Sequence, residues 1–105
     1  MKNNCVICHK HSNESLPTLY HGKTCIVYHY FPVNEKETMY QGHLFVETKR
    51  HVPSFAELTS DEARELGELT RVCAKVLKQA LDAEHVYTFT ISDQVQHLHM
   101  HVLAR

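Results

Sequence analysis

The stretch His97-Leu98-His99-Met100-His101-Val102-Leu103, near the end of the 105-residue chain, decides the fold class. Histidine and apolar residues alternate through it, which is the period of a half-buried β-strand. His97, His99 and His101 are expected on one face, about 7 Å apart at ~3.3 Å per residue, with the apolar side chains entering a core from the other. Ten of the 105 residues are histidine, so a chance cluster is the plain alternative. Histidine content does not explain the strict alternation, and an ordered row of imidazoles normally marks a functional site.

Composition limits the classes of protein. Eleven basic and twelve acidic residues give a net charge of −1, so charge offers no case for a nucleic-acid partner. The sequence has no apolar run of ~18 residues and no signal-like segment, which predicts a cytoplasmic protein that does not bind membranes. Residues 1–105 are expected to form a single small domain. Four cysteines in such a protein indicate metal ligands or buried thiols rather than disulfides.

The N-terminal stretch Cys5-Val6-Ile7-Cys8-His9-Lys10-His11 is rich in metal ligands. Two thiolates separated by two residues can hold one tetrahedral zinc ion, so residues 1–15 are interpreted as a zinc knuckle. Two further ligands must come from elsewhere. His9 and His11 are close in sequence, but consecutive ligands in so short a loop would strain a tetrahedral site. A reduced thiol pair without metal stays an alternative, because a C-x-x-C pair alone is ambiguous.

The remaining patterns predict an α+β fold, with an antiparallel sheet of about five strands and one long helix packed on it. Strands are expected at 18–20, 24–30, 42–48, 85–91 and 97–103. The helix is expected over 59–82, beginning at a capping box formed by Thr59 and Glu62. Its apolar positions, including Leu66, Cys73, Val76, Leu77 and Ala80, recur every three or four residues and predict a core-facing side. Its charged residues, Glu62 included, are expected to be solvated, and Cys25 is expected to be a buried thiol.

Several motifs together resemble a known family. His97-x-His99-x-His101-Val102-Leu103 resembles the signature of the histidine triad (HIT) proteins, which are nucleotide hydrolases and transferases. The stretch from Gly42 to Val52 is similar to the family's glycine-histidine strand and the basic-histidine turn after it. Cys5-x-x-Cys8 resembles the pair found in the zinc-containing branch. The resemblance implies that Cys5, Cys8, His51 and His97 are zinc ligands, and that the zinc is structural, since four protein ligands leave no open position.

The resemblance also implies a reaction. His99 would be the nucleophile that attacks an α-phosphate and forms a covalent nucleotidyl-histidine, which water then hydrolyses. His101 would donate a hydrogen bond to the phosphate or leaving group, and His97 would fix the geometry while bound to zinc. Related uridylyltransferases carry glutamine at the third position, so His101 favours a hydrolase. The substrate would be a nucleoside phosphoramidate, a dinucleoside polyphosphate or a related nucleotide conjugate.

Three residues are candidates for binding the nucleotide. Gln94 stands where relatives usually place a hydroxyl, three residues before the first triad histidine, and a glutamine can also donate to a phosphate oxygen. Asn34 is a candidate contact to the ribose. His43 has two interpretations. It either borders the nucleotide site or is a buried histidine hydrogen-bonded to the backbone. The second is favoured, because buried polar groups are usually hydrogen-bonded.

The resemblance favours a homodimer, because HIT proteins pair their sheets across a two-fold axis and a small domain gains core in this way. Two rival functions stay open. In one, the histidine row itself holds a catalytic or regulatory metal ion. In the other, the protein binds a nucleotide as a regulator without turning it over. The sequence has no glycine-rich phosphate loop or acidic ligand cluster that would favour a magnesium-dependent enzyme.

Overall fold

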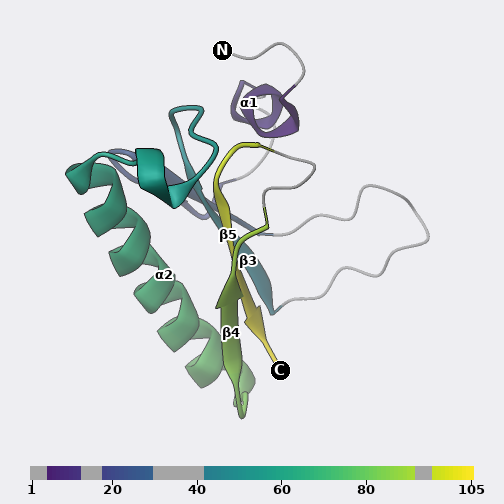
Figure 1. Cartoon of the computed structure of the whole chain (residues 1–105). Coiled ribbons are helices and arrows are strands. Elements are labelled where there is room, and N and C mark those ends of the chain that lie inside the picture. The colour runs from purple at the N-terminus through teal and green to yellow at the C-terminus, as the bar shows by residue number, and fades with distance from the viewer. Residues whose placement is uncertain (1–4, 13–17, 30–41, 92–95) are drawn as a thin grey trace.

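A five-stranded antiparallel sheet forms the centre of the computed structural model, which describes residues 5–12, 18–29, 42–91 and 96–105 (Figure 1). The strands lie in the order β1-β2-β3-β5-β4. Their bounds are Tyr20–His21 for β1, Cys25–His29 for β2, His43–Thr48 for β3, Val86–Phe89 for β4 and His99–Ala104 for β5. The α+β fold with one long helix on an antiparallel sheet is therefore confirmed. The candidates Asn34 and Gln94 lie outside the described residues.

Two helices and one short 3-10 turn complete the described structure. The long helix α2, Ser60–Leu81, lies along one face of the sheet, and α1, Val6–His11, lies at one end of it (Figure 1). The 3-10 turn η1, Phe55–Glu57, comes shortly before α2. Within the stretch interpreted as a zinc knuckle, α1 begins directly after Cys5, which is its N-cap. No helix of the described part of the chain is long and apolar enough to cross a membrane.

The register of β3 against β5 separates the two faces of the sheet. Phe45 pairs with His101 and Glu47 pairs with His99, so these four side chains lie on one face. We call this the histidine face. Leu44 and Val102 are also cross-strand partners, and both belong to the core beneath α2. The alternation in the sequence therefore places the imidazoles of β5 opposite the helix.

The core fills the space between the sheet and α2. Val46 and Val102 are fully buried, and Leu66 and Leu98 are almost so. Cys25 and Cys73 also lie in this cluster, which confirms the expectation that they are buried thiols. Burial raises the pKa of each thiol to about 11, so both are protonated at neutral pH.

The capping box predicted for α2 is present, but two expectations about the faces of the helix are wrong. Thr59 accepts a hydrogen bond from the Glu62 N–H at 3.1 Å, and Glu62 accepts one from the Thr59 N–H at 2.8 Å. Glu62 is buried rather than solvated, because its carboxylate also accepts from two nitrogens of Arg50, at 3.0 and 2.8 Å. Val76 and Ala80 are exposed rather than core, since only part of the predicted stripe is covered by the sheet.

Candidate metal centre and histidine site

Four predicted ligands come together in one cluster. The ligand atoms of Cys5, Cys8, His51 and His97 all lie within 4.8 Å of one another. The His97 Nδ1 atom is 3.5 Å from Cys5 Sγ and 3.4 Å from Cys8 Sγ, and His51 Nδ1 is 3.4 Å from Cys8 Sγ. A tetrahedral zinc ion with Zn–S bonds of ~2.3 Å and Zn–N bonds of ~2.0–2.1 Å would separate sulfur from nitrogen by roughly 3.6 Å. The donor set and its spacing therefore fit a tetrahedral metal ion.

Local structure explains how these ligands meet. Cys5 is the N-cap of α1, and its sulfur accepts a hydrogen bond from the Cys8 N–H at 3.3 Å, which holds the two thiols on one side of the first turn. His51 lies in the turn after β3. Arg50 ties that turn to the start of α2 through Glu62, and to η1 through the Glu57 carbonyl oxygen at 3.0 Å.

His97 belongs to the metal cluster rather than to the strand. It is fully buried and precedes β5, which begins at His99, two residues later than predicted. Its Nε2–H donates to the Thr48 carbonyl oxygen at 2.7 Å, which leaves the Nδ1 lone pair for a metal. Burial lowers the pKa of His97. The row expected along one face of the strand is therefore formed by His99 and His101.

His99 has one ring nitrogen fixed by the backbone. Its Nδ1 lies 2.7 Å from the His97 carbonyl oxygen. A carbonyl oxygen can only accept, so Nδ1 carries the hydrogen and Nε2 carries the lone pair when the imidazole is neutral. The ring is half-buried and lies at an edge-on angle to Phe45, with 5.8 Å between the ring centroids. This arrangement leaves the lone pair of the neutral His99 ring on Nε2.

His101 and His43 share a hydrogen bond between side chains, with 3.0 Å between His101 Nδ1 and His43 Nε2. Burial, followed by the nearby His99 and His43, lowers the pKa of His101 to about 4. Burial, followed by His29, lowers the pKa of His43 as well. Both imidazoles are therefore neutral at pH 7, and one proton lies between the two facing nitrogens. His43 thus adjoins the histidine row by a direct contact with one of its members.

Aromatic rings enclose His101. The Phe89 ring of β4 stacks on it, with 4.5 Å between centroids and 8° between planes, and Phe45 packs edge-on at 4.7 Å. These rings cover part of the imidazole, and its burial is the largest cause of its lowered pKa, followed by the nearby His99 and His43. Neither phenylalanine was identified from the sequence as part of the site.

Glu47 is the other residue that sequence reasoning missed. It is 1% exposed, it is the cross-strand partner of His99, and it pairs with Lys10 and His11 of α1. The sequence did offer one signal for it. Glu47 is the one acidic residue of β3, and the alternation of the strand places it on the same face as His43. The sequence does not show that its partners come from the N-terminal helix.

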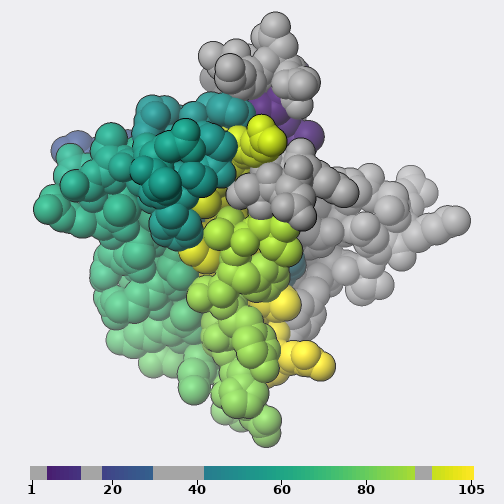
Figure 2. Space-filling model, viewed as in Figure 1, coloured from purple at the N-terminus to yellow at the C-terminus, as the bar shows by residue number. Residues whose placement is uncertain are grey.

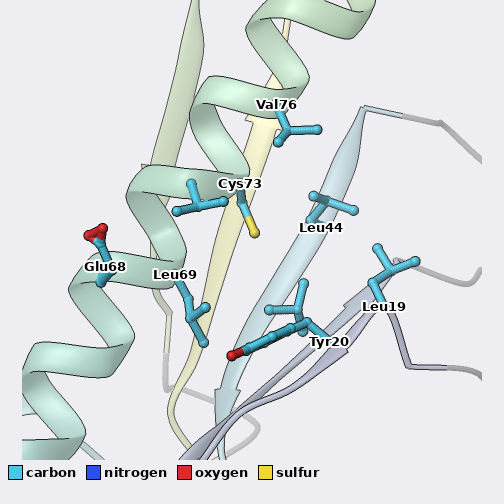
Figure 3. Close-up of a pocket in the computed structure, with 9 residues that line it drawn as sticks. Leu19, Tyr20, Leu44, Glu68, Leu69, Cys73 and Val76 are labelled. Atoms are coloured by element: carbon cyan, nitrogen blue, oxygen red, sulfur yellow. The ribbon is translucent and has the colours of Figure 1, made fainter.

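A separate apolar groove of about 490 Å³ lies between α2 and the β1–β2 side of the sheet (Figure 3). Leu19, Leu44, Leu69 and Val76 are among the residues that line it. The groove lies on the helix side of the sheet, whereas His99 and His101 lie on the other. Its lining is almost wholly apolar, so it offers no chemistry comparable with that of the histidine face.

Comparison with known proteins identifies the class of protein that this fold and site define. The HIT domain family matches residues 19–105, and the chain belongs to this family. The family comprises nucleotide-binding hydrolases and transferases. The Cys/His cluster is consistent with its zinc-containing branch. No curated protein matches the chain significantly in sequence.

Solved structures of low sequence identity share the fold. A HIT family protein from Bacillus anthracis is 18% identical with a TM-score of 0.78, over 100% of this chain and 75% of that one. The Plasmodium falciparum diadenosine triphosphate hydrolase is 15% identical with a TM-score of 0.69, over 84% of this chain and 60% of that one. The Caenorhabditis elegans NitFhit protein is 22% identical with a TM-score of 0.70, over 84% of this chain. The chain spans only 21% of the length of NitFhit.

Proposed function

We propose that this protein is a HIT-type nucleotide hydrolase that works through a covalent nucleotidyl-histidine on His99. The substrate is a nucleoside phosphoramidate, a dinucleoside polyphosphate or a related nucleotide conjugate. The observation that carries the proposal is the 2.7 Å hydrogen bond from His99 Nδ1 to the His97 carbonyl oxygen. It holds the imidazole in the tautomer whose other nitrogen can attack phosphorus.

The first step forms one bond and breaks one. The lone pair of His99 Nε2 attacks the α-phosphorus, and the bond from phosphorus to the leaving group breaks. If His43 Nε2–H donates to His101 Nδ1, then His101 carries its own hydrogen on Nε2. That N–H donates a hydrogen bond to the leaving group, which takes its proton from solvent water as it departs, so His101 stays neutral. In the second step water attacks the same phosphorus, the N–P bond breaks, its electron pair returns to His99 Nε2, and the proton of the water passes to solvent.

The Cys5, Cys8, His51 and His97 cluster is proposed to hold a structural zinc ion. When bound, the ion supplies a cross-link between the start of α1 and the turns that precede β5 and follow β3. With four protein ligands it has no open position for water. The contribution of this site to the reaction is to hold His97, whose carbonyl oxygen orients His99.

The geometry favours this proposal over the metal-dependent rival. Among the residues that the structure describes, the Cys/His cluster is the only group of three or more ligands close enough to hold an ion. His99 and His101 belong to no such group. The proposal also retains Gln94, Asn34 and His43 as nucleotide-binding residues, and residues 1–105 as one domain that pairs as a homodimer.

The experiment that tests the nucleophile compares wild type with His99→Ala, using a radiolabelled nucleoside phosphoramidate. Rapid quenching at alkaline pH, where phosphohistidine bonds survive, should trap labelled nucleotide on wild type and none on the variant. Hydrolysis should fall by several orders of magnitude while AMP still binds. His85→Ala, a change at an exposed histidine beside β4, is the matched control and should label like wild type.

Two results would contradict parts of the proposal. Wild-type turnover by His99→Ala would rule out His99 as the nucleophile. AMP binding by wild type without hydrolysis of any nucleotide conjugate would instead favour a nucleotide-binding regulator.

A further inference from the structure

A buried carboxylate lies on the histidine face and is not used by the proposed reaction. Glu47 is 1% exposed, and its two oxygens contact different side chains of α1. Oε1 accepts from His11 Nε2 at 2.9 Å, and Oε2 accepts from the Lys10 ammonium. Burial acts to raise the pKa of Glu47, but its bonds to His11 and Lys10 outweigh this effect and hold the pKa below its ordinary value. The residue is therefore an anion in the folded protein.

The same two side chains of α1 cover the aromatic surface beside His99. The His11 ring stacks on Tyr28, with 5.7 Å between centroids and 8° between planes. The Lys10 ammonium lies 4.2 Å from the centroid of Tyr28 and 5.3 Å from that of Phe45. The Phe45 ring in turn contacts the rings of His99 and His101. The end of α1 thus lies on the same face of the sheet as His99, against Tyr28 and Phe45.

Helix α1 is consequently attached at two places. Its first turn carries Cys5 and Cys8 of the metal cluster, and its last turn carries Lys10 and His11. A buried ion pair adds little net stability compared with apolar residues of the same volume. The ion pair instead fixes the orientation of α1, because both oxygens of Glu47 have hydrogen-bond partners only when α1 lies in one orientation against β3.

We propose that Glu47 is a positioning residue that docks the end of α1 on the histidine face and thereby completes one wall of the nucleotide site. The proposal rests on the proposed function, because it takes the space over His99 as the place where the nucleotide binds. Glu47 itself does not touch the substrate. It acts through Lys10 and His11, whose positions limit the space available to the nucleotide.

The experiment uses Glu47→Gln, which keeps the shape of the side chain and removes its charge, and Lys10→Met, which removes the ammonium. Glu65→Gln is the matched control. The Glu65 carboxylate also accepts several hydrogen bonds, from Thr24 and Cys25 among others, but it lies on α2 at the other face of the sheet. Each variant is tested for AMP affinity, for KM and kcat, and for hydrogen exchange of the His9 and Ser12 amides, which bond within α1.

Glu47→Gln should raise the Kd for AMP and the KM on the order of tenfold, within the usual range for coupled sites, and leave kcat close to wild type. The His9 and Ser12 amides should exchange faster. Lys10→Met should do the same, and the double variant should be no worse than Glu47→Gln alone, because the two residues act as one unit. Glu65→Gln should lower thermal stability without moving KM or the α1 amides.

The proposal is overturned if Glu47→Gln lowers only the stability, as the Glu65→Gln control is expected to do. In that case the AMP affinity and the exchange of the α1 amides would stay at wild-type values. Independent, additive effects of Glu47→Gln and Lys10→Met on KM would also overturn it. Should Glu47→Gln fail to fold, Lys10→Met decides alone, since Lys10 lies outside the sheet and is 23% exposed at its side chain. If wild type neither binds AMP nor hydrolyses nucleotides, the proposed function is wrong, and so is the role of α1 as a wall of the nucleotide site. The amide exchange of Glu47→Gln then still shows whether Glu47 docks α1 on β3.

Discussion

Three histidines at alternate positions have three different environments. His97 is fully buried and directs Nδ1 at two thiols. His99 is half-buried and has its tautomer set by a backbone carbonyl. His101 is enclosed by phenylalanine rings and bonded to another imidazole. The same residue type thus serves as ligand, nucleophile and hydrogen-bond donor in the proposed function, because the surroundings of each ring differ.

The pKa of His101 makes stability depend on pH. The value is about 4 in the folded protein and ~6.5 in an unfolded chain, so the unfolded state binds the proton first as pH falls. The contribution of neutral His101 is therefore complete above pH ~6.5 and is lost progressively between ~6.5 and ~4. His101→Asn, which cannot be protonated, should lose less stability from pH 7 to pH 5, as measured by urea unfolding. Equal losses in wild type and variant would contradict the burial of His101.

His101 can also be tested as a hydrogen-bond donor to the leaving group. His101→Ala should slow hydrolysis of a nucleoside phosphoramidate by about 10²–10³, the usual effect of losing one donor to a reacting oxyanion or leaving group. The loss should be much smaller for the p-nitrophenyl ester of AMP, because nitrophenolate is a stable anion that needs little stabilisation from a donor as it departs. The measurement is kcat for both substrates. An equal loss for both would show that His101 acts on the phosphate oxygens rather than on the leaving group.

At the scale of elements, the structure depends on contacts between the ends of neighbouring elements. Arg50, in the turn after β3, bonds to Glu62 in the first turn of α2, and these bonds hold the turn that carries His51. The Arg50 contact and the capping box hold the pKa of Glu62 down at about 2, despite burial. The start of the long helix and the turn of the candidate metal ligand His51 are therefore both held by one carboxylate.

Periodicity and capping were enough to predict the five strands and the long helix, and not enough to predict α1 or these contacts. The alternation around His99 predicts strand β5, and the Thr59–Glu62 capping box predicts the start of α2. Both are local patterns in the sequence. Helical periodicity places Glu62 on the solvated face, because its partner Arg50 lies twelve residues earlier in the chain, outside the helix. Glu47 was missed because Lys10 and His11 come from another element. The ligands His51 and His97 followed from family resemblance, since no local spacing connects them to Cys5 and Cys8.

The capping box gives a prediction for α2. Thr59→Ala removes the oxygen that accepts from the Glu62 N–H, and should lower the free energy of unfolding by about 1 kcal/mol. Thr59→Ser keeps the hydroxyl and should stay close to wild type. Urea unfolding at pH 7 measures both. Equal stability of the two variants would show that the Arg50–Glu62 contact fixes the start of the helix without the cap.

For the whole molecule, the proposed zinc cross-link predicts one ion per chain in protein purified without added metal. Cys8→Ala should lose the ion and much of its stability, because the free energy of binding a structural zinc contributes to folding. The control Cys73→Ala removes a core thiol remote from the cluster, and should destabilise the protein without changing metal content. Elemental analysis and thermal unfolding measure the two effects. A metal-free wild type as stable as the metal-loaded protein would contradict a structural role.

The largest scale is the assembly. Strand β4 is an edge of the sheet, and its residues lie at the surface in the space-filling view (Figure 2). Tyr87 of β4 is 46% exposed, and an uncovered edge strand offers backbone groups to a second strand. We expect the homodimer to pair two β4 strands across a two-fold axis, so that the sheet continues from one protomer into its partner.

Light scattering at micromolar concentration should therefore give twice the 12.2 kDa mass of the chain. Tyr87→Lys places like charges on facing strands and should shift the mass toward one chain. Leu19→Lys, in the apolar groove beside α2, is the matched change at the other exposed apolar surface and should leave the dimer intact. If Leu19→Lys separates the protomers and Tyr87→Lys does not, the interface is the groove. A wild-type mass of one chain would rule out both interfaces at that concentration, and the assignment of His99 would be unaffected because its described contacts all lie within one protomer.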